Sequence, residues 1–562
     1  MSYALSSGVT GLQAHQKMLD VAGNNLANVN TTAFKASRIA FEELLSQTLE
    51  QASQPTDRVG GTNPQQMGSG VGISGVIPDT TQGSIVNTGS PLDMAIEGAG
   101  YFVVNDGERN LYSRAGTFGV DEEGNLVDPS TGYCVQRIGL TGEEDGFQIA
   151  GETSIRVPYD VALPANATSE ITFTGNLSSN AAAEARAQVL TSSLRYTCDD
   201  GMEPATTTQI DRLDQFSGGS GVDGQLGAGE TGTITISGYH KDGTVYSSGL
   251  SFTVTETSTV GDLVSHLNTN VLVGATASLV NGRIRIADDE TGCSKSDIML
   301  TYSGSGTLDM PPYFELTSVG GDEVKGVNIA IYDSQGGKHV LSAALVRTDA
   351  VNTWDMVLTS VSGNVYSINL GDRRVNGVSF DPLTGAFLDV AAGEAAKFVV
   401  QFDHDVLHPQ ELTLNFGTRG SFDGLTQFGG NSTAVARGQD GYEAGSLTAV
   451  SVSPEGVLIG AFSNGIKKDL ATVQIALFNN AAGLQSVGSG YFTTSANSGG
   501  AVATQATRSG AGAIHGGALE KSNADVATEF VNMIQAQNGF QANARTIRVA
   551  NDILRELTSL IR

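Results

Sequence analysis

The chain has 562 residues, of which 59 are acidic and 31 are basic, so its formal charge at pH 7 is −28. This balance argues against a nucleic-acid binder, which needs a basic face, and against docking on an anionic membrane. The 40% share of hydrophobic residues and the 71 glycines are typical of a globular protein with many turns. The length predicts three or four domains.

The first residues, MSYALSSGVTGLQAHQKMLD, have neither the basic start nor the continuous apolar run of a cleaved secretory signal. No run of 18 apolar residues follows, so we expect no membrane insertion. If the protein is extracellular, it needs another export route. Its cysteines, Cys134, Cys198 and Cys293, are too few and too widely spaced for a disulfide framework or a zinc site.

Both ends of the chain have the pattern of amphipathic helices. Near the N-terminus a leucine occurs at every seventh residue, and this spacing predicts a helix over 3–29. A longer helix is expected to start near Ser522, with Asp525 as a partner in its cap, and to continue to the C-terminus. The two apolar stripes are Leu5, Leu12, Leu19 and Leu26, and then Val526, Phe530, Met533, Phe540, Ile547 and Leu554.

A single helix cannot bury such a stripe and is marginal in water. We therefore expect the two helices to pair as a coiled coil with its seam at the stripes, and neighbouring subunits to cover what remains. We infer that the ends are disordered before assembly. The alternative is that both helices belong to one ordinary globular core.

Between about residues 68 and 478 the hydrophobic period is two, which predicts short strands. Asp242-Gly243 and Asn281-Gly282 predict hairpin turns, and 260–268 is expected to be helical. A chain whose ends pair must insert its middle domains one inside another. The predicted fold is therefore mainly β, with paired terminal helices and nested, discontinuous domains.

A search for catalytic or metal-binding motifs finds one cluster worth weighing, FDHDVLH, with His404, Asp405 and His408. In the strand that its surroundings suggest, residues four apart are too distant to share an ion. We therefore expect no metal, no cofactor and no catalytic site. A secreted carbohydrate-active enzyme stays an alternative, although the single tryptophan, Trp354, disfavours a sugar-binding cleft.

Two segments carry a family resemblance. GNNLANVNTTAFK, over 23–35, resembles the signature of the flagellar rod, hook and hook-associated proteins, with Ala33 where that family usually has glycine. The stretch 519–557 resembles the closing helix of the same family. The signature residues here are Asn24, Asn25, Leu26, Asn28, Thr31, Phe34 and Lys35.

Within this family, three features favour the hook subunits over the compact rod subunits. The chain is long, 331–356 resembles an outer domain of hook proteins, and 424–484 resembles the return into their inner β domain. The stretch 183–311 is an addition relative to the shortest members. The expected domains are a helical domain (1–30 with 520–562), an extended linker (31–80), an inner β domain (81–156 with 418–519), an outer β domain (157–182 with 312–417) and an added outer domain (183–311).

The resemblance implies a helical homopolymer, the flexible curved tube of the flagellum, built outside the cell. It implies distal rod and hook-associated junction proteins as neighbours, and the type III export apparatus and a hook cap as assembly partners. A distal rod or hook-associated protein is the alternative. Gly68, Gly70, Gly72 and Gly75 predict a hinge after the first helix. Cys198 invites comparison with covalently joined hook subunits, but no matching motif accompanies it.

Overall fold

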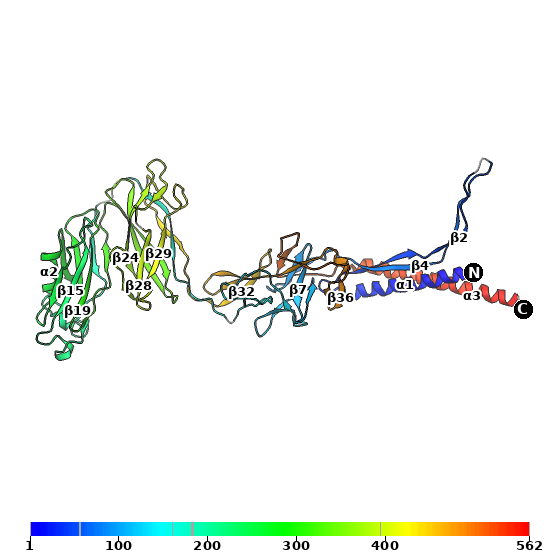
Figure 1. Ribbon diagram of the computed structural model, residues 1–562, viewed down its shortest axis with the longest axis horizontal. Helices are drawn as coiled ribbons and strands as arrows, with labels where there is room; N and C mark the ends of the chain where they lie inside the picture. The colour runs from blue at the N-terminus through cyan, green and yellow to red at the C-terminus, as the bar shows by residue number, and fades with distance from the viewer. Residues whose placement is uncertain (1, 56–57, 160, 181–184, 394, 561–562) are drawn as a thin grey trace. The chain divides into compact units, whose positions relative to one another are not determined.

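The computed structural model describes residues 2–55, 58–159, 161–180, 185–393 and 395–560 (Figure 1). The chain divides into two compact units: unit 1 is Met1–Leu163 with Gly445–Arg562, and unit 2 is Pro164–Ala444. Where the chain leaves unit 1 and returns, Leu163 and Gly445 exchange backbone hydrogen bonds of 2.7 and 3.1 Å. One unit is thus inserted into the other, as the pairing of the two ends requires.

Unit 1 holds the two terminal helices and the strands that follow and precede them. Its helices are α1 (Ser2–Ala27) and α3 (Val526–Leu560). Its strands before the insertion are β1 (Ser37–Glu43), β2 (Ser46–Glu50), β3 (Gln65–Gly68), β4 (Val71–Pro78), β5 (Ile85–Asn87), β6 (Met94–Glu97), β7 (Tyr101–Asn105), β8 (Asn110–Ser113), β9 (Gly119–Val120), β10 (Leu126–Val127) and β11 (Cys134–Val135). After the insertion come β32 (Leu447–Val452), β33 (Val457–Phe462), β34 (Lys467–Thr472), β35 (Ile475–Leu477), β36 (Gln485–Gly488), β37 (Tyr491–Thr493), β38 (Val502–Thr504), β39 (Ala513–Gly516) and β40 (Ala518–Glu520).

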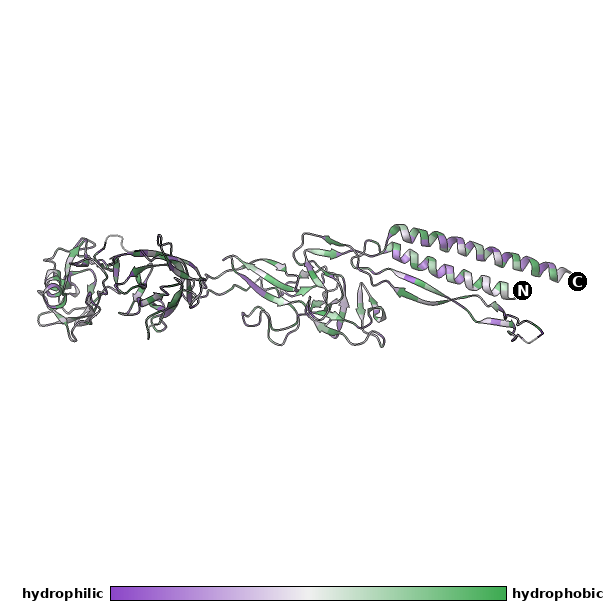
Figure 2. Ribbon diagram, turned by 90° about the horizontal axis from the view of Figure 1, so that it is seen from above, coloured by the Kyte–Doolittle hydropathy of each residue, from purple (hydrophilic) through white to green (hydrophobic). Residues whose placement is uncertain are grey.

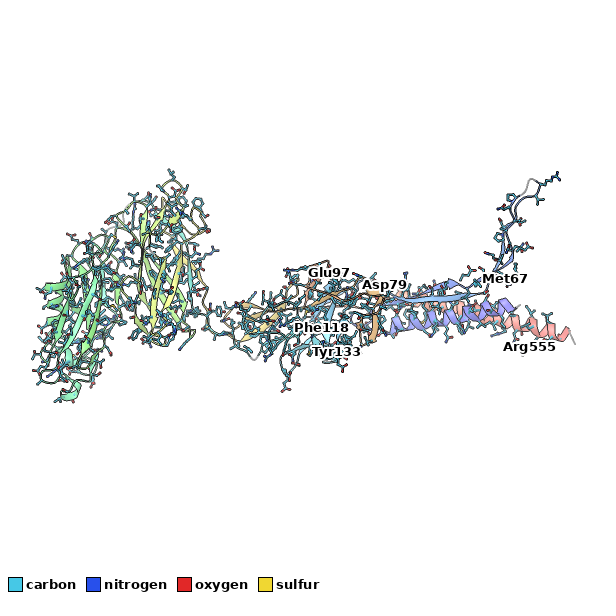
Figure 3. All side chains as sticks on the ribbon, in the orientation of Figure 1. Met67, Asp79, Glu97, Phe118, Tyr133 and Arg555 are labelled. Atoms are coloured by element: carbon cyan, nitrogen blue, oxygen red, sulfur yellow. The ribbon has the colours of Figure 1, made fainter. Side chains whose placement is uncertain are left out.

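Strands from both arms of the chain interleave in unit 1. The main sheet has the order β36-β37-β8-β7-β11-β10-β9, and β35 pairs with both β7 and β38. Outside it, β39 pairs with β6 and β40 with β5, so the C-terminal arm is bound to the N-terminal one up to the start of α3. Aromatic side chains pair within unit 1: Phe118 packs against Phe102, and Tyr133 packs against Tyr491. Phe118 and Tyr133 are labelled in Figure 3.

Unit 2 is built from strands with one short helix, α2 (Val260–His266), which a reciprocal Thr259–Asp262 capping box starts. Its strands up to the end of the added stretch are β12 (Glu170–Ser178), β13 (Val189–Ser192), β14 (Phe216–Ser217), β15 (Gly232–Tyr239), β16 (Ser251–Val254), β17 (Ala275–Val280), β18 (Arg283–Asp288), β19 (Asp297–Gly304) and β20 (Thr307–Leu308). The others are β21 (Phe314–Ser318), β22 (Val324–Tyr332), β23 (Lys338–Arg347), β24 (Thr353–Val361), β25 (Val365–Ser367), β26 (Arg374–Phe380), β27 (Phe387–Asp389), β28 (Lys397–Phe402), β29 (Gln410–Asn415), β30 (Leu425–Phe428) and β31 (Val435–Gln439).

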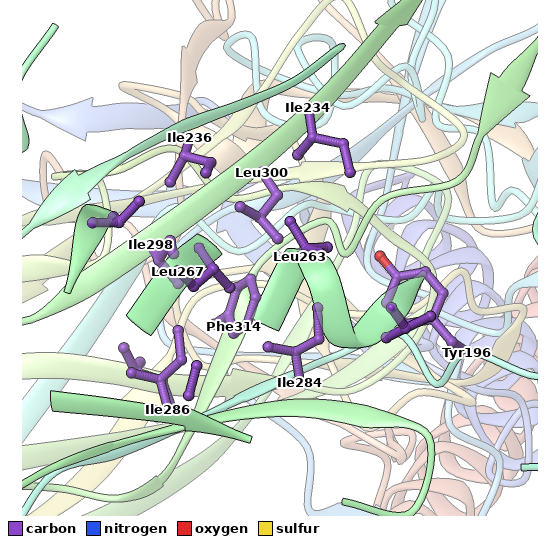
Figure 4. Close-up of a cluster of buried hydrophobic side chains, with 14 of the residues drawn as sticks. Tyr196, Ile234, Ile236, Leu263, Leu267, Ile284, Ile286, Ile298, Leu300 and Phe314 are labelled. Atoms are coloured by element: carbon purple, nitrogen blue, oxygen red, sulfur yellow. The ribbon is translucent and has the colours of Figure 1, made fainter. Parts of the chain in front are cut away.

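Two hydrophobic cores stabilise unit 2. The first lies between the sheets β16-β15-β19 and β17-β18-β13-β21, and Leu263 and Leu267 from α2 and the following turn extend into it (Figure 4). The second lies between β22-β23-β24-β26-β27 and β25-β28-β29-β12-β30, and its largest member is the fully buried Trp354. Buried and more exposed residues alternate along β15, β18 and β28, as a two-residue period predicts.

The mainly β fold with a helix at each end is confirmed. The Asn281-Gly282 hairpin is also confirmed, with both residues at positive φ between β17 and β18. The predicted α2 is present, and α1 ends two residues before the predicted boundary. Within the described residues, no helix is long and apolar enough to cross a membrane.

Two predicted boundaries differ from the structure. Residues 31–80 are not an extended linker, because β1 pairs with β4 and β2 pairs with β3 in antiparallel hairpins. The boundary predicted at 418 lies inside unit 2, because β30 and β31 both pair with β12. The alternation in β1 was too short to be recognised, and strand partners far apart in sequence leave no local signal. The division of unit 2 at 183 and 311 stays a prediction.

Candidate assembly site at the terminal helices

The helices α1 and α3 run antiparallel and side by side (Figures 1 and 2). Where they touch, glycines of one helix face larger side chains of the other. A Cβ added at Gly8 would lie 2.9 Å from Cγ1 of Ile547, and one at Gly11 would lie 2.8 Å from the Asn543 amide group. Likewise, a Cβ at Gly539 would lie 2.5 Å from the His15 ring. A side chain at any of these three positions would therefore have to displace the side chain that it faces.

The heptad period of the sequence is visible on α3, where Glu529, Ala536, Asn543 and Ala550 face α1, one every seven residues. Gly539 and Ile547 face α1 as well. On α1, the buried positions are Gly8, Gly11, Ala14, Ala22 and Asn25. Glycine, alanine and asparagine carry no weight in a search for apolar stripes, so the seam could not be found that way.

Among the predicted apolar residues, Ile547 contacts α1 at Gly8, and the others are half-buried or exposed. Leu5, Leu12, Leu19 and Leu26 are half-buried, as are Met533 and Ile547. Val526, Phe530, Phe540 and Leu554 are exposed. Further exposed apolar residues on α3, which sequence reasoning did not single out, are Val531, Ile534, Val549 and Ile553. The single chain therefore leaves an apolar surface on α3 that α1 does not cover.

The hairpin of β1 and β4 packs along another face of α1. The backbone N–H of Val71 donates to Thr10 Oγ1 at 3.3 Å, and the rings of His15 and Phe41 lie 6.1 Å apart. Gly70 permits this approach, because its φ of +128° and a Cβ position 2.3 Å from Thr10 Oγ1 admit no side chain.

The glycines of the predicted hinge occupy this hairpin. Gly68 ends β3, and Gly72 and Gly75 lie in β4. Gly75 pairs with Ala40 beside an irregularity in the ladder, and no atom lies within 4 Å of a Cβ there. A local irregularity with open space is compatible with bending, and the hinge stays a prediction.

The loop after α1 is anchored by Asn25. The side-chain Nδ2 of Asn25 donates to the Ser37 carbonyl oxygen at 2.7 Å and to Glu529 Oε1 at 3.0 Å, and its Oδ1 accepts from the Ser37 N–H at 2.9 Å. One buried amide thus connects α1, β1 and α3. Asn28 Nδ2 donates to the Asn24 carbonyl, and Thr31 Oγ1 donates to Asn28 Oδ1, so these two residues close the turn that ends the helix.

Glu520 binds this loop to the rest of unit 1. Its Oε1 accepts from Lys35 Nζ at 2.6 Å and from the Gly83 N–H at 2.8 Å, and its Oε2 lies 3.6 Å from Arg114. All three charged side chains are nearly buried. Burial lowers the pKa of Lys35 against the opposing effect of Glu520. Removing one partner from such a cluster leaves a buried charge without its counterion, which is strongly destabilising.

Asn523 makes similar hydrogen bonds between distant segments just before the start of α3. Its Oδ1 accepts from the Ala36 N–H at 2.7 Å, and its Nδ2 donates to the carbonyl oxygens of Asp79 and Thr81. The cap of α3 is Asp525, whose Oδ2 accepts from the Thr528 N–H at 2.9 Å, and not Ser522 as predicted.

Comparisons with known proteins agree with this arrangement along the whole chain. Family profiles match at residues 5–35 (flagella basal body rod protein), 95–178 (flagellar hook protein FlgE/F/G D1 domain), 324–442 (flagellar basal body protein FlaE D2 domain) and 515–560 (flagellar basal body rod FlgEFG protein C-terminal). The flagellar hook protein FlgE of Borreliella burgdorferi is 30% identical over 564 residues, which cover 100% of both chains. The chain belongs to the flagellar hook protein family.

Other hook proteins match over a similar extent. FlgE of Treponema pallidum is 30% identical over 566 residues, with 100% of both chains covered. FlgE of Escherichia coli is 25% identical, with 99% of this chain and 100% of that one covered. The crystal structure of Helicobacter pylori FlgE2 aligns with a TM-score of 0.36 at 16% identity, covering 72% of this chain and 93% of that one.

Ala33, which stands where the family signature usually has glycine, adopts a backbone conformation that favours glycine. Ala33 is buried and has a φ of +57°, in the left-handed region that favours glycine. Its N–H donates to the Glu520 carbonyl oxygen at 2.8 Å, so the strained turn is held by the same residue that binds Lys35.

The FDHDVLH segment is not a strand, contrary to the expectation. After β28 ends at Phe402 the chain turns, so that His404, Asp405 and His408 line one pocket of about 150 Å³. Among the described residues, no group of three such ligands is placed to hold a metal ion. The expectation that these residues lie along a strand, too far apart to share an ion, was therefore wrong.

One series of contacts resembles the nucleophile, base and acid of a catalytic triad, and it consists of Ser334, His404 and Asp333. Ser334 Oγ is 3.2 Å from His404 Nε2, and His404 Nδ1 is 3.7 Å from Asp333 Oδ2. The N–H groups of Gln335, Gly336 and Gly337 already donate to Asp333, so these amides are not available to an oxyanion. Cys198 and Trp354 are both buried in unit 2.

Proposed function

We propose that this chain is the structural subunit that polymerises into the flagellar hook, the curved tube that transmits motor torque from rod to filament. The observation that carries this proposal is the match to hook proteins over the full length, including both helical ends and the domains between them. Rod proteins share the ends, but the matching relatives named above are hook proteins along their whole chains.

The surface that would drive polymerisation is the outer face of α3. Phe530 and Ile534 are 50% and 55% exposed, one turn apart, and Val531 lies beside them. At about 25 cal/mol per Å² of apolar area, covering several such side chains supplies several kcal/mol before the entropy cost of association. Every further copy of the chain carries the same helix, so a helical polymer repeats this apolar surface at each subunit.

The small seam between α1 and α3 supports the proposal that the ends order during assembly. Ala14 and Ala22 on α1 and Ala536 on α3 are buried, but each contributes little apolar area. A pair held this weakly suits a chain that passes unfolded through the flagellar type III export apparatus without a cleaved signal. Distal rod and hook-associated junction proteins would contact the two ends of the polymer, and a hook cap would guide its growth.

Electron microscopy of the purified chain tests the proposal. The full chain should form curved tubes, whereas a variant that lacks 2–27 and 526–562 should stay monomeric, with its unit 2 still folded. Circular dichroism of the truncated variant checks that its strands remain. Straight short tubes would favour a rod protein. Dispersed full-length chains with hydrolytic activity would favour an enzyme, and curved tubes from the truncated variant would contradict the proposed role of the helices.

A further inference from the structure

Asp333 lies in the turn between β22 and β23 and faces two histidines. Nε2 of His339 is 2.9 Å from Asp333 Oδ2, and Nδ1 of the same ring is 2.8 Å from the Ser362 carbonyl oxygen. Both partners are acceptors. A neutral imidazole carries a single N–H, so the doubly protonated ring alone can make both hydrogen bonds.

The second histidine, His404, approaches the same carboxylate oxygen of Asp333, with its Nδ1 at 3.7 Å. The rings of His339 and His404 both stack against the ring of Phe402, with centroid distances of 4.3 and 6.0 Å. A cation on either ring gains from the carboxylate at this distance in a partly buried place.

Other charged groups lie around these three side chains. His408 and Asp405 form an exposed pair at 2.9 Å in the turn after β28. Lys338 precedes His339 on β23 and is exposed, and Glu443 lies beside the turn at Gly336. Lys338 opposes a positive charge on His339, whereas Glu443 and Asp405 favour one. All these groups except the Asp333–His339 pair are open to solvent screening.

The Asp333 carboxylate stays ionised in this setting. Burial disfavours its charge, but hydrogen bonds from His339 and from the N–H groups of Gly337 and Gln335 outweigh that effect and lower its pKa below the usual value. A carboxyl group with a depressed pKa contributes stability above its unfolded value and loses it as the pH falls through the folded value.

This turn supports both chain segments by which unit 2 begins and ends. Added to Gly336, a Cβ would lie 2.8 Å from Cβ of Ala165 and 3.4 Å from Cα of Glu443. The Thr168 N–H donates to the Tyr332 carbonyl oxygen at 2.9 Å, one residue before Asp333. Gln410 Nε2 donates to the carbonyl oxygens of both residues of that pair, at 2.7 and 2.9 Å.

We propose that Asp333, His339 and His404 form a proton-sensitive clamp that holds the turn 333–337 against the entering segment 164–168 and the leaving segment 442–444. With the histidines protonated, both hydrogen bonds of His339 are made and the clamp is closed. When His339 loses a proton, either the bond to Asp333 or the bond to Ser362 is lost. The clamp is closed when Asp333 is ionised and His339 is protonated, and it loosens when His339 loses its proton.

In an assembled hook, a looser clamp at higher pH would free the chain segments by which unit 2 begins and ends, and this consequence rests on the proposed function. The clamp itself is a property of the single chain. Amide hydrogen exchange on the monomer therefore tests it without polymerisation. Protection factors, corrected for the intrinsic pH dependence of exchange, are measured for the Gln335, Gly337 and Thr168 amides at pH 5.5 and pH 8. In the wild type they should fall several-fold at the higher pH.

Three variants sharpen the test. His339→Gln cannot titrate and should show equal protection at both values. Asp333→Asn should show low protection at both, with the fluorescence of Trp354 reporting that unit 2 is folded. His240→Gln, in the same unit but in edge-to-face contact with Tyr246, should keep the wild-type response. Equal wild-type protection at both pH values would overturn the clamp, as would a full pH response in His339→Gln or its loss in His240→Gln.

Discussion

The terminal helices and unit 2 bury their residues in opposite ways. Unit 2 encloses large side chains, among them Trp354 and Phe398, between its own sheets. The α1–α3 pair instead buries glycine and alanine and leaves Phe530 and Ile534 exposed. The difference teaches that unit 2 completes its core within one chain, whereas the helices leave an apolar surface exposed, which the proposed polymer would cover.

The largest expected effect comes from a substitution in the core of unit 2. Trp354→Ala should destabilise unit 2 by about 3–5 kcal/mol, because a fully buried indole leaves a cavity. The unfolding transition of unit 1 should stay where it is. Differential scanning calorimetry separates the two transitions, and an equal shift of both would mean that the units do not unfold independently.

A change of similar size is expected in unit 1 from Glu520→Ala. Lys35 and Arg114 would then keep buried charges without a counterion, at a cost of about 3–5 kcal/mol. Limited proteolysis should cut the loop 28–36 sooner than in the wild type. The control is Lys17→Ala, which breaks an exposed pair with Asp20 and should change stability by less than about 1 kcal/mol. An equal effect of both variants would rule out a structural role for the buried cluster.

The close approach of α1 and α3 is tested by two substitutions at glycines of the same helix. Gly11→Leu places a side chain where Asn543 lies and should destabilise the pair by about 1–3 kcal/mol. Gly23→Ala meets no atom within 4 Å and should stabilise α1 by up to about 1 kcal/mol. Circular dichroism during thermal unfolding measures both, and helices that tolerate Gly11→Leu would contradict the small-residue seam.

The smallest expected effect concerns the turn at the end of the signature. Ala33→Gly should stabilise unit 1 by about 1 kcal/mol, because glycine adopts a φ of +57° without the steric cost that alanine bears. Chemical denaturation followed by circular dichroism gives the difference. A loss of stability would indicate that the packing of the Ala33 methyl group outweighs the strain.

Local patterns predicted what is local in this molecule. The Asn281-Gly282 turn and α2 depend on residues within a few positions, and the helical ends follow from their period. The close contacts of the helix pair were not predicted from apolar residues, because glycines at positions 8, 11 and 539 make them. A search for small residues at heptad spacing would have been the signal.

The pairing of strands that lie far apart in the sequence was not predicted. The β1–β4 hairpin joins strands separated by 27 residues, and β12 receives β30 and β31 from the other arm of the chain. The segment around His404 has the composition of a strand, but it ends β28 in a turn that brings it to Asp333. Tertiary contacts, which no local window contains, decide such places.

The exposed face of α3 is where the account is tested most directly. Ile534→Asp places a charge in this face and should abolish curved tubes in the electron microscope while the monomer keeps its wild-type circular dichroism. The matched control, Gln535→Asp, adds the same charge at the neighbouring exposed position and should polymerise. Curved tubes of normal length from Ile534→Asp would show that α3 assembles through another surface and would contradict the account.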